Sequence, residues 1–247
     1  MELEGKIALV TGGSNGIGAE TVKELAKRGC RVVIGYNNGA NRAKKLVEAL
    51  YGSGHTCLKI CLEQYDTIKQ AELFVKNSYG KLDFLINSAG YTEPIKHKDL
   101  ESLTPAKFNS IVNTNAGGTY AVIQTFVPLL RKTSGATIVN VSSVSAFTGS
   151  GSNIAYCAAK AAIDTMTISL ARALGPHIRV LCVSPAAVAT NFVEGRTIEH
   201  LKSIAERTPM KKIITASDVA LGILACLTHL TSSTGTKVVI DGGHHIK

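Results

Sequence analysis

The sequence of 247 residues contains no tryptophan, and aromatic residues make up only 5% of it. It also has no run of five or more basic residues, although its formal net charge is +9. Proteins that bind nucleic acids generally combine clustered cations with aromatic side chains that stack on bases. We therefore expect no nucleic-acid partner. We attribute the positive charge to a solvated basic surface, with a surface for anionic ligands as the alternative.

Long hydrophobic runs and paired cysteines are absent as well. No stretch approaches 18 consecutive apolar residues, and the first six residues (MELEGK) lead straight into a short apolar segment. We therefore expect neither a transmembrane helix nor a signal peptide. The six cysteines are scattered and form no CxxC pair, which is typical of free thiols in a reducing compartment. These features predict a cytoplasmic protein without a membrane partner or a metal site.

Charged residues make up only 18% of the chain, whereas hydrophobic residues make up 45%. A disordered chain would show the opposite balance, so we expect a sizeable buried core. The length fits one large α/β domain, and no repeat, low-complexity tract or linker divides the sequence. We therefore expect residues 1–247 to form a single domain.

Short β-branched runs alternate with segments whose apolar residues recur at helical spacing. The candidate strands are residues 6–11, 31–35, 56–62, 82–87, 136–142, 178–184 and 236–241. Helical spacing is clearest in residues 20–28, 40–51, 116–130 and 155–174. The strands are almost continuously apolar, which indicates that both of their faces are covered. The alternation predicts parallel βαβ units. The expected fold is α/β, a doubly wound Rossmann-type domain whose seven-stranded parallel sheet carries helices on both faces and ligands at the strand ends.

Residues 11–18 (TGGSNGIG) form a glycine-rich turn directly after the first candidate strand. Glycines allow the backbone to approach a phosphate closely, and the N-terminus of the following helix offers unpaired N–H groups and a favourable dipole. Such turns also occur without a ligand. The position of this one, at the start of a βαβ unit, favours a dinucleotide site.

Four motifs, taken together, resemble the short-chain dehydrogenase/reductase family in order and spacing. They are the TGxxxGxG turn at residues 11–18, NSAG at 87–90, YxxxK at 156–160 and DGG at 241–243. The whole chain is most similar to 3-oxoacyl-carrier-protein reductases and related ketoreductases of the single-domain branch. The resemblance implies a nicotinamide cofactor and a reaction that interconverts a carbonyl and an alcohol.

The resemblance also implies which residues contact the cofactor. They are Gly12, Ser14, Asn15, Gly16, Ile17, Gly18, Tyr36, Asn37, Leu62, Asn87, Ala89, Gly90, Val188 and Thr190, together with Tyr156 and Lys160. Val188 and Thr190 belong to residues 185–190 (PAAVAT), a segment that is similar to the PGxxxT segment of the family. Two residues depart from the family pattern. Ala186 stands in place of a glycine, and Cys61 stands where members often carry an aspartate near the adenine.

Tyr156 and Lys160 are four residues apart, so they share one face of a helix that is otherwise almost wholly apolar. A free tyrosine has a pKa of roughly 10, and a nearby ammonium group lowers it. Such a tyrosine can serve as the acid or base for a carbonyl or an alcohol. The alternative is a lysine whose ammonium group merely extends to the surface.

Two further catalytic residues are implied by the family pattern. Ser143 lies thirteen residues before Tyr156, at the spacing of the family's catalytic serine, and its hydroxyl would bind the substrate oxygen. Ser142 is the alternative and is implied to be a supporting neighbour. Asn115 aligns with the family's helix asparagine, which anchors a water that relays protons. Asn113 is instead a candidate for the helix surface. The predicted tetrad is Asn115, Ser143, Tyr156 and Lys160.

The absence of acidic residues also bears on cofactor choice. An acid about 20 residues past the glycine turn typically binds the ribose 2′-hydroxyl of NAD, but residues 25–47 contain no Asp or Glu. Tyr36 and Asn37 occupy the end of the second strand, and Arg42 is placed to fold back onto a 2′-phosphate. We therefore expect NADP(H) to be favoured over NAD(H). Asn15 stands where many NADP-using relatives carry a basic residue, which argues for a modest preference.

The leading functional hypothesis is a reductase for ketones or 3-oxoacyl thioesters. An NAD-linked alcohol or sugar dehydrogenase is the alternative, and a nucleotide-sensing regulator without catalysis is a third hypothesis that the complete tetrad disfavours. The substrate pocket is expected from residues 92–100, 145–153 and 191–210. Basic residues that could meet an acidic carrier protein or a CoA phosphate are Lys96, Lys98, Lys202, Arg207, Lys211 and Lys212. Helices with apolar residues on more than one face predict a homo-oligomer, a tetramer or a dimer.

Overall fold

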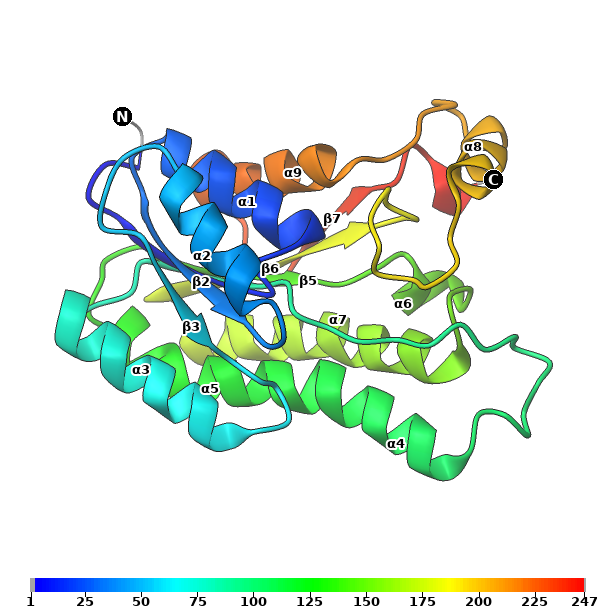
Figure 1. Cartoon of the computed structure of the whole chain (residues 1–247), viewed down its shortest axis with the longest axis horizontal. Coiled ribbons are helices and arrows are strands. Elements are labelled where there is room, and N and C mark those ends of the chain that lie inside the picture. The colour runs from blue at the N-terminus through cyan, green and yellow to red at the C-terminus, as the bar shows by residue number, and fades with distance from the viewer. Residues whose placement is uncertain (1–2, 247) are drawn as a thin grey trace.

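The computed structural model describes residues 3–246, which form one seven-stranded sheet with helices on both faces (Figure 1). The strands are β1 (Ile7–Thr11), β2 (Arg31–Tyr36), β3 (Thr56–Lys59), β4 (Phe84–Asn87), β5 (Ala136–Val141), β6 (Ile178–Pro185) and β7 (Lys237–Ile240). Their order in the sheet is β3-β2-β1-β4-β5-β6-β7, and every neighbouring pair is parallel. The predicted fold class is confirmed. The predicted domain also includes residues 1, 2 and 247, which lie outside the described residues.

Two layers of helices bury the two faces of this sheet (Figure 1). One layer contains α1 (Gly16–Lys27), α2 (Ala40–Ala49) and α9 (Ala216–Thr228). The other contains α3 (Tyr65–Tyr79), α4 (Pro105–Val112), α5 (Gly118–Leu130) and α7 (Ile154–Leu174). The short α6 (Ser145–Thr148) and α8 (Ile198–Glu206) lie beyond the carboxyl ends of the central strands. Each layer forms its own cluster of buried apolar side chains with the sheet, which explains the continuous apolar character of the strands.

The register of the central strands brings distant segments to one edge. Thr11 at the end of β1 is paired with Asn87 of β4, and Asn87 is paired with Asn140 of β5. The glycine-rich turn after β1, the loop after β4 and the segment after β5 therefore emerge side by side. This edge lies where the chain changes direction between β1 and β4, the usual ligand-binding position in a doubly wound sheet.

Some element boundaries differ from the sequence prediction. The strand expected at residues 56–62 ends at Lys59, because β3 is an edge strand and the Cys61 N–H turns away to donate to the Thr67 hydroxyl (2.9 Å). The helix expected at 20–28 already begins at Gly16, where the Asn15 side chain caps it. The helix expected at 116–130 is the end of a longer helical stretch, in which the π-helical turn η1 (Asn113–Gly117) joins α4 to α5.

Among residues 3–246, α7 is the one helix whose length and composition would also suit a membrane span. In this structure it packs against β6, α4 and α6. Its apolar character therefore fits a helix that covers one face of the sheet.

Candidate functional site

A cavity of about 1030 Å³ runs along the carboxyl ends of the strands. Its walls come from the turn after β1, the loop after β4, the segment after β5, the first turns of α7 and the segment between β6 and α8. Most of the sequence-predicted site residues line this cavity. They are Gly12, Ser14, Asn15, Gly16, Ile17, Asn37, Leu62, Ala89, Gly90, Ser143, Tyr156, Lys160, Val188 and Thr190.

The glycine-rich turn is closed by contacts that exclude side chains. A Cβ on Gly12, whose φ is 65°, would lie 2.9 Å from Ala89 Cα, and a Cβ on Gly18 would lie 2.3 Å from the Gly12 carbonyl oxygen. The turn thus packs against the loop after β4 and against the start of α1. No acidic residue lies in the first turn of α1, so its N-terminus remains favourable to an anion. The turn forms a cradle of the kind that a pyrophosphate requires.

Three predicted cofactor residues do not line the cavity. Gly18 lies inside the turn, and Tyr36 packs against the core beneath α1 and α2. Asn87 is buried, and its Nδ2 donates to Asn140 Oδ1 (2.9 Å). Its own Oδ1 has no hydrogen-bond partner in the described part of the chain. All three support the cavity wall from behind.

The end of the cavity near β2 carries a guanidinium and a hydroxyl that converge on one point. A Cβ on Gly39 would lie 2.6 Å from Ser14 Oγ and 2.8 Å from Arg42 Nη2. Within residues 3–246, Arg42 makes no hydrogen bond or ion pair, and its side chain lines the cavity beside Asn37. This end of the cavity therefore offers an unneutralised cation next to two polar side chains.

Both departures from the family pattern fit the backbone. Among residues 3–246, Lys211 is the only residue other than glycine with a positive φ. Ala186 therefore needs no conformation that its methyl group would disfavour. Cys61 does not line the cavity, whereas its neighbour Leu62 does, so Leu62 faces the cavity at this position.

Tyr156 and Lys160 lie one turn apart on α7 and both face the cavity. Lys160 is only 4% exposed, which excludes the interpretation as a surface lysine. Its Nζ donates to the Val141 carbonyl oxygen (2.8 Å) and lies 5.5 Å from the centre of the Tyr156 ring. The Asn153 side chain caps α7 by accepting from the Tyr156 N–H (2.7 Å). The pair is thus held by the sheet on one side and by a helix cap on the other.

The electrostatics of this pair differ from the sequence prediction. Burial raises the pKa of Tyr156, and the hydrogen bond from Ser143 and the positive charge of Arg196 only partly oppose it. The lowered pKa that the sequence predicted is therefore wrong for the protein without its cofactor. Desolvation disfavours the phenolate more than the nearby cations favour it. Burial lowers the pKa of Lys160 to about 8, against the opposing effect of Asp164.

The two neighbouring serines have different partners. Ser143 lines the cavity and hydrogen-bonds the Tyr156 hydroxyl, and its Oγ also donates to Ser145 Oγ (3.1 Å). The Ser142 hydroxyl donates to Asp164 Oδ1 (2.5 Å), behind Lys160. Ser143 is therefore the serine whose hydroxyl faces the cavity beside Tyr156, whereas the Ser142 hydroxyl is bound behind it.

Asn115 lies in the π-helical turn and is fully buried, so it does not line the cavity. Its Nδ2 donates to the carbonyl oxygens of Tyr91 (2.7 Å) and Ile111 (2.8 Å), and its Oδ1 accepts from the Tyr91 N–H (3.2 Å). Asn115 thereby fastens the loop after β4 to the helical layer. Asn113 is exposed, as expected for a helix-surface residue.

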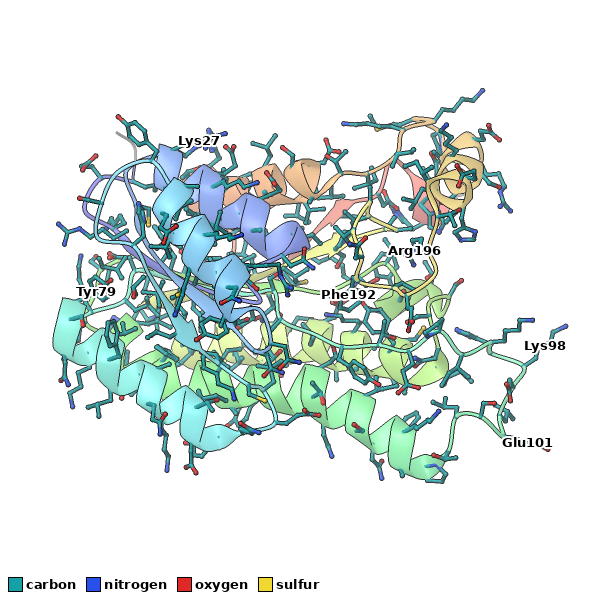
Figure 2. The ribbon with its side chains drawn as sticks, viewed as in Figure 1. Lys27, Tyr79, Lys98, Glu101, Phe192 and Arg196 are labelled. Carbon is teal, nitrogen blue, oxygen red and sulfur yellow. The ribbon has the colours of Figure 1, made fainter. Side chains whose placement is uncertain are left out.

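One substrate-pocket prediction is wrong. Residues 145–153 and 191–210 both contribute to the cavity wall, but residues 92–100 do not. The Ile95 N–H donates to the Ser152 carbonyl oxygen (2.9 Å), so this loop packs behind the segment that forms the wall. Figure 2 labels Lys98 at the outer tip of the loop. Of the six basic residues predicted for a carrier or CoA, only Arg207 lines the cavity.

Three residues near Tyr156 and Lys160 were not singled out from the sequence. Asp164 follows Lys160 by one helical turn and also forms an ion pair with Lys237 (2.7 Å). Phe192 and Arg196, labelled in Figure 2, come from the segment between β6 and α8. The Phe192 ring lies 5.9 Å from the Tyr156 ring. An acid at four-residue spacing in an apolar helix was the available signal for Asp164, whereas nothing in the sequence pointed to Arg196.

Comparison with known proteins is consistent with this geometry. Residues 6–200 match the family model of the short chain dehydrogenases. The chain is 32% identical to a 3-oxoacyl-[acyl-carrier-protein] reductase of Thermotoga maritima, over 98% of this chain and 99% of the relative. It is 30% identical to an acetoacetyl-CoA reductase of Cupriavidus necator, over 98% of both. A short chain dehydrogenase of Burkholderia cenocepacia J2315, solved in complex with NADP, is 30% identical and superposes with a TM-score of 0.88 over 99% of both chains.

Proposed function

Because the chain belongs to the short-chain dehydrogenase/reductase family, we propose that it is an NADP(H)-dependent oxidoreductase that reduces a ketone or 3-oxoacyl group to a secondary alcohol, or catalyses the reverse. The coarser activity, interconversion of a carbonyl and an alcohol with a nicotinamide cofactor, is that of the family. The observation that carries the proposal is the Ser143–Tyr156–Lys160 arrangement in one cavity with the glycine-rich turn. The names of the two reductase relatives support a 3-oxoacyl carbonyl compound as the substrate.

The cavity offers suitable groups for each part of the cofactor. The cradle formed by Gly12, Gly16 and Ile17 would hold the pyrophosphate, and Arg42 would hold a 2′-phosphate. Thr190 lies opposite the turn, since a Cβ on Gly16 would be 3.3 Å from Thr190 Cγ2. Val188 and Thr190 would hold the nicotinamide amide, and Lys160 the nicotinamide ribose. The bound cofactor supplies the hydride for the reduction.

The residues of this chain position the carbonyl and supply its proton. Burial keeps Tyr156 protonated at neutral pH, so its hydroxyl is ready to donate a proton to the carbonyl oxygen during reduction. The Ser143 hydroxyl donates to the same oxygen and stabilises the charge that develops on it. The buried ammonium of Lys160 stabilises the phenolate that remains on Tyr156. Asn115 holds the loop after β4 in place through its hydrogen bond to the Tyr91 carbonyl oxygen.

The direct test is an absorbance assay of nicotinamide oxidation with a panel of neutral ketones, diketones and 3-oxoacyl thioesters, using NADPH and NADH in parallel. We expect carbonyl-dependent consumption of NADPH. If no carbonyl compound in the panel leads to oxidation of either cofactor, the proposed function is wrong.

Replacing Asp164 by asparagine is expected to move the alkaline limb of kcat/KM to lower pH. The Asp164 carboxylate opposes the burial that lowers the pKa of Lys160 to about 8, so its removal lowers that pKa further. Lys160 then loses its proton at a lower pH. The pH profile of Lys237→Gln is the matched control, because it removes the exposed partner of Asp164 and leaves the carboxylate. Superimposable limbs in Asp164→Asn and the unmodified protein would contradict this role.

We also propose a homo-oligomer, a tetramer or a dimer. Tyr120 on α5 is 48% exposed, and Ile168 on α7 is 43% exposed, although both helices already bury another face against the sheet. A second copy that pairs the same helices across a two-fold axis would cover these side chains. Light scattering after size exclusion at micromolar concentration is expected to give a tetramer. A monomer at that concentration would rule out the assignment.

We also propose that the enzyme is cytoplasmic. All six cysteines are free, and five of them are buried, which suits a compartment that keeps thiols reduced.

A further inference from the structure

The part of the cavity beyond Tyr156 is lined by cationic and titratable nitrogen side chains. They are Arg196, His200, Arg207, His244 and His245. Among the described residues, the only acidic one in the lining is Glu63, which lies next to Leu62 at the opposite end and accepts from the Thr114 hydroxyl. Asp241 is near His245, but it accepts hydrogen bonds from the His245 ring (2.6 Å) and from the backbone N–H of Gly243 and His245. Within residues 3–246, the lining of the substrate end therefore carries no unpaired negative charge and suits an anion.

Arg196 is the strongest candidate to bind that anion. It is half-buried and lines the same cavity as Tyr156, and within residues 3–246 its side chain makes no hydrogen bond or ion pair. Arg207 differs, because it is exposed and donates to the Ser203 carbonyl oxygen (3.0 Å) and hydroxyl (3.1 Å). A cation removed from water without a partner is unfavourable. The free guanidinium of Arg196 therefore points to a ligand that supplies the missing negative charge.

The position of Arg196 also bears on where the anion lies relative to the reacting group. Arg196 lines the same cavity as Tyr156. Phe192, four residues before Arg196 in the same segment, packs against the Tyr156 ring. Figure 2 shows Phe192 and Arg196 in the region between that segment and α7. A group bound to Arg196 and a carbonyl at Tyr156 would therefore lie in the same cavity, next to the Phe192 ring.

We propose that the substrate is an oxo acid, a carbonyl compound with a carboxylate close to the reacting carbonyl, and that Arg196 binds this carboxylate. This inference rests on the proposed function, because it takes the Ser143 and Tyr156 hydroxyls as the place of the carbonyl oxygen. A planar guanidinium pairs with a carboxylate through two parallel hydrogen bonds. Esters and thioesters of the same acid lack the negative charge, so Arg196 selects the free acid against them.

Two other roles for Arg196 give different results. If it binds a phosphate of the cofactor, its removal weakens NADPH binding and affects all substrates alike. If Arg196 acts only by stabilising the Tyr156 phenolate, its removal slows the reduction of acids and of esters equally. Selective loss of the acid is expected only when Arg196 binds the carboxylate.

The experiment compares 2-oxobutanoate, 3-oxobutanoate and 4-oxopentanoate with their ethyl esters. The three acids vary the distance between the carbonyl and the carboxylate, and each ester removes the negative charge at the same distance. Initial rates with NADPH give kcat/KM for the unmodified protein, Arg196→Gln, Arg196→Lys and Arg131→Gln. Arg131 is an exposed arginine just after α5, outside the cavity, so its variant controls for the loss of one positive charge. NADPH affinity is measured separately by fluorescence titration.

We expect the unmodified protein to prefer at least one acid over its ester by about 10- to 100-fold, the range of a hydrogen bond between charged groups. Arg196→Gln should abolish this ratio with unchanged NADPH affinity, Arg196→Lys should restore part of it, and Arg131→Gln should keep it. Equal rates for every acid and its ester in the unmodified protein overturn the inference, as does an unchanged ratio in Arg196→Gln. If esters and neutral ketones are still reduced in those cases, the proposed function stands. It falls only if no carbonyl compound is reduced.

Discussion

Replacing Tyr156 by phenylalanine is expected to lower the rate of carbonyl reduction by about 10²- to 10⁴-fold or more. The variant loses only the hydroxyl that Ser143 hydrogen-bonds, while the ring can still pack between Phe192 and the Lys160 ammonium. The acid that protonates the carbonyl oxygen disappears, and the walls of the cavity remain. Cofactor affinity should therefore change little.

Single-turnover reduction and NADPH affinity, measured on the same preparation, separate these effects. Tyr51→Phe is the matched control, because Tyr51 is exposed just after α2 and lies outside the cavity. Near-normal turnover in Tyr156→Phe would show that another group serves as the acid. A parallel loss of NADPH binding would show that the hydroxyl acts mainly on the cofactor.

Replacing Arg42 by glutamine is expected to reduce the preference for NADPH over NADH by about 10- to 100-fold, as the loss of a hydrogen bond between charged groups predicts. Arg42 and Ser14 both reach the point beside Gly39, and Arg42 has no partner within residues 3–246. Tyr36→Asp, at the carboxyl end of β2 and next to Asn37 of the cavity wall, should lower the preference further, because a carboxylate there repels a 2′-phosphate.

The measurement is kcat/KM for both cofactors at saturating carbonyl substrate. Lys45→Gln is the control, because it removes an exposed positive charge from the same helix without touching the cavity. A preference for NADH in the unmodified protein would contradict the NADP(H) assignment and favour an NAD-linked alcohol or sugar dehydrogenase. An unchanged ratio in Arg42→Gln would show that this guanidinium does not select the cofactor.

The fold could be predicted from the sequence because its signals are local and repeated. The apolar runs of β1 and β5 are buried along their whole length, and the segments between strands are long enough for helices that cross over a parallel sheet. The ends of some helices and strands could not be predicted in this way, because they depend on tertiary contacts. The end of β3 depends on its having a neighbour on one side only, and the π-helical turn depends on bonds from Asn115 to a loop that is distant in sequence.

The sequence by itself determined the sheet, the glycine-rich turn and the positions of Tyr156 and Lys160, because each depends on spacing along one strand or one helix. Only the tertiary structure decided how the charges around Tyr156 balance. The raised pKa of Tyr156 follows from burial by segments far apart in the chain. Asp164 and Arg196 matter because the fold brings Asp164 to Ser142 and Arg196 near Tyr156. Desolvation and charge pairing depend on distances in space. A motif shows which groups are present, whereas the packed structure determines which of them remain protonated or unpaired.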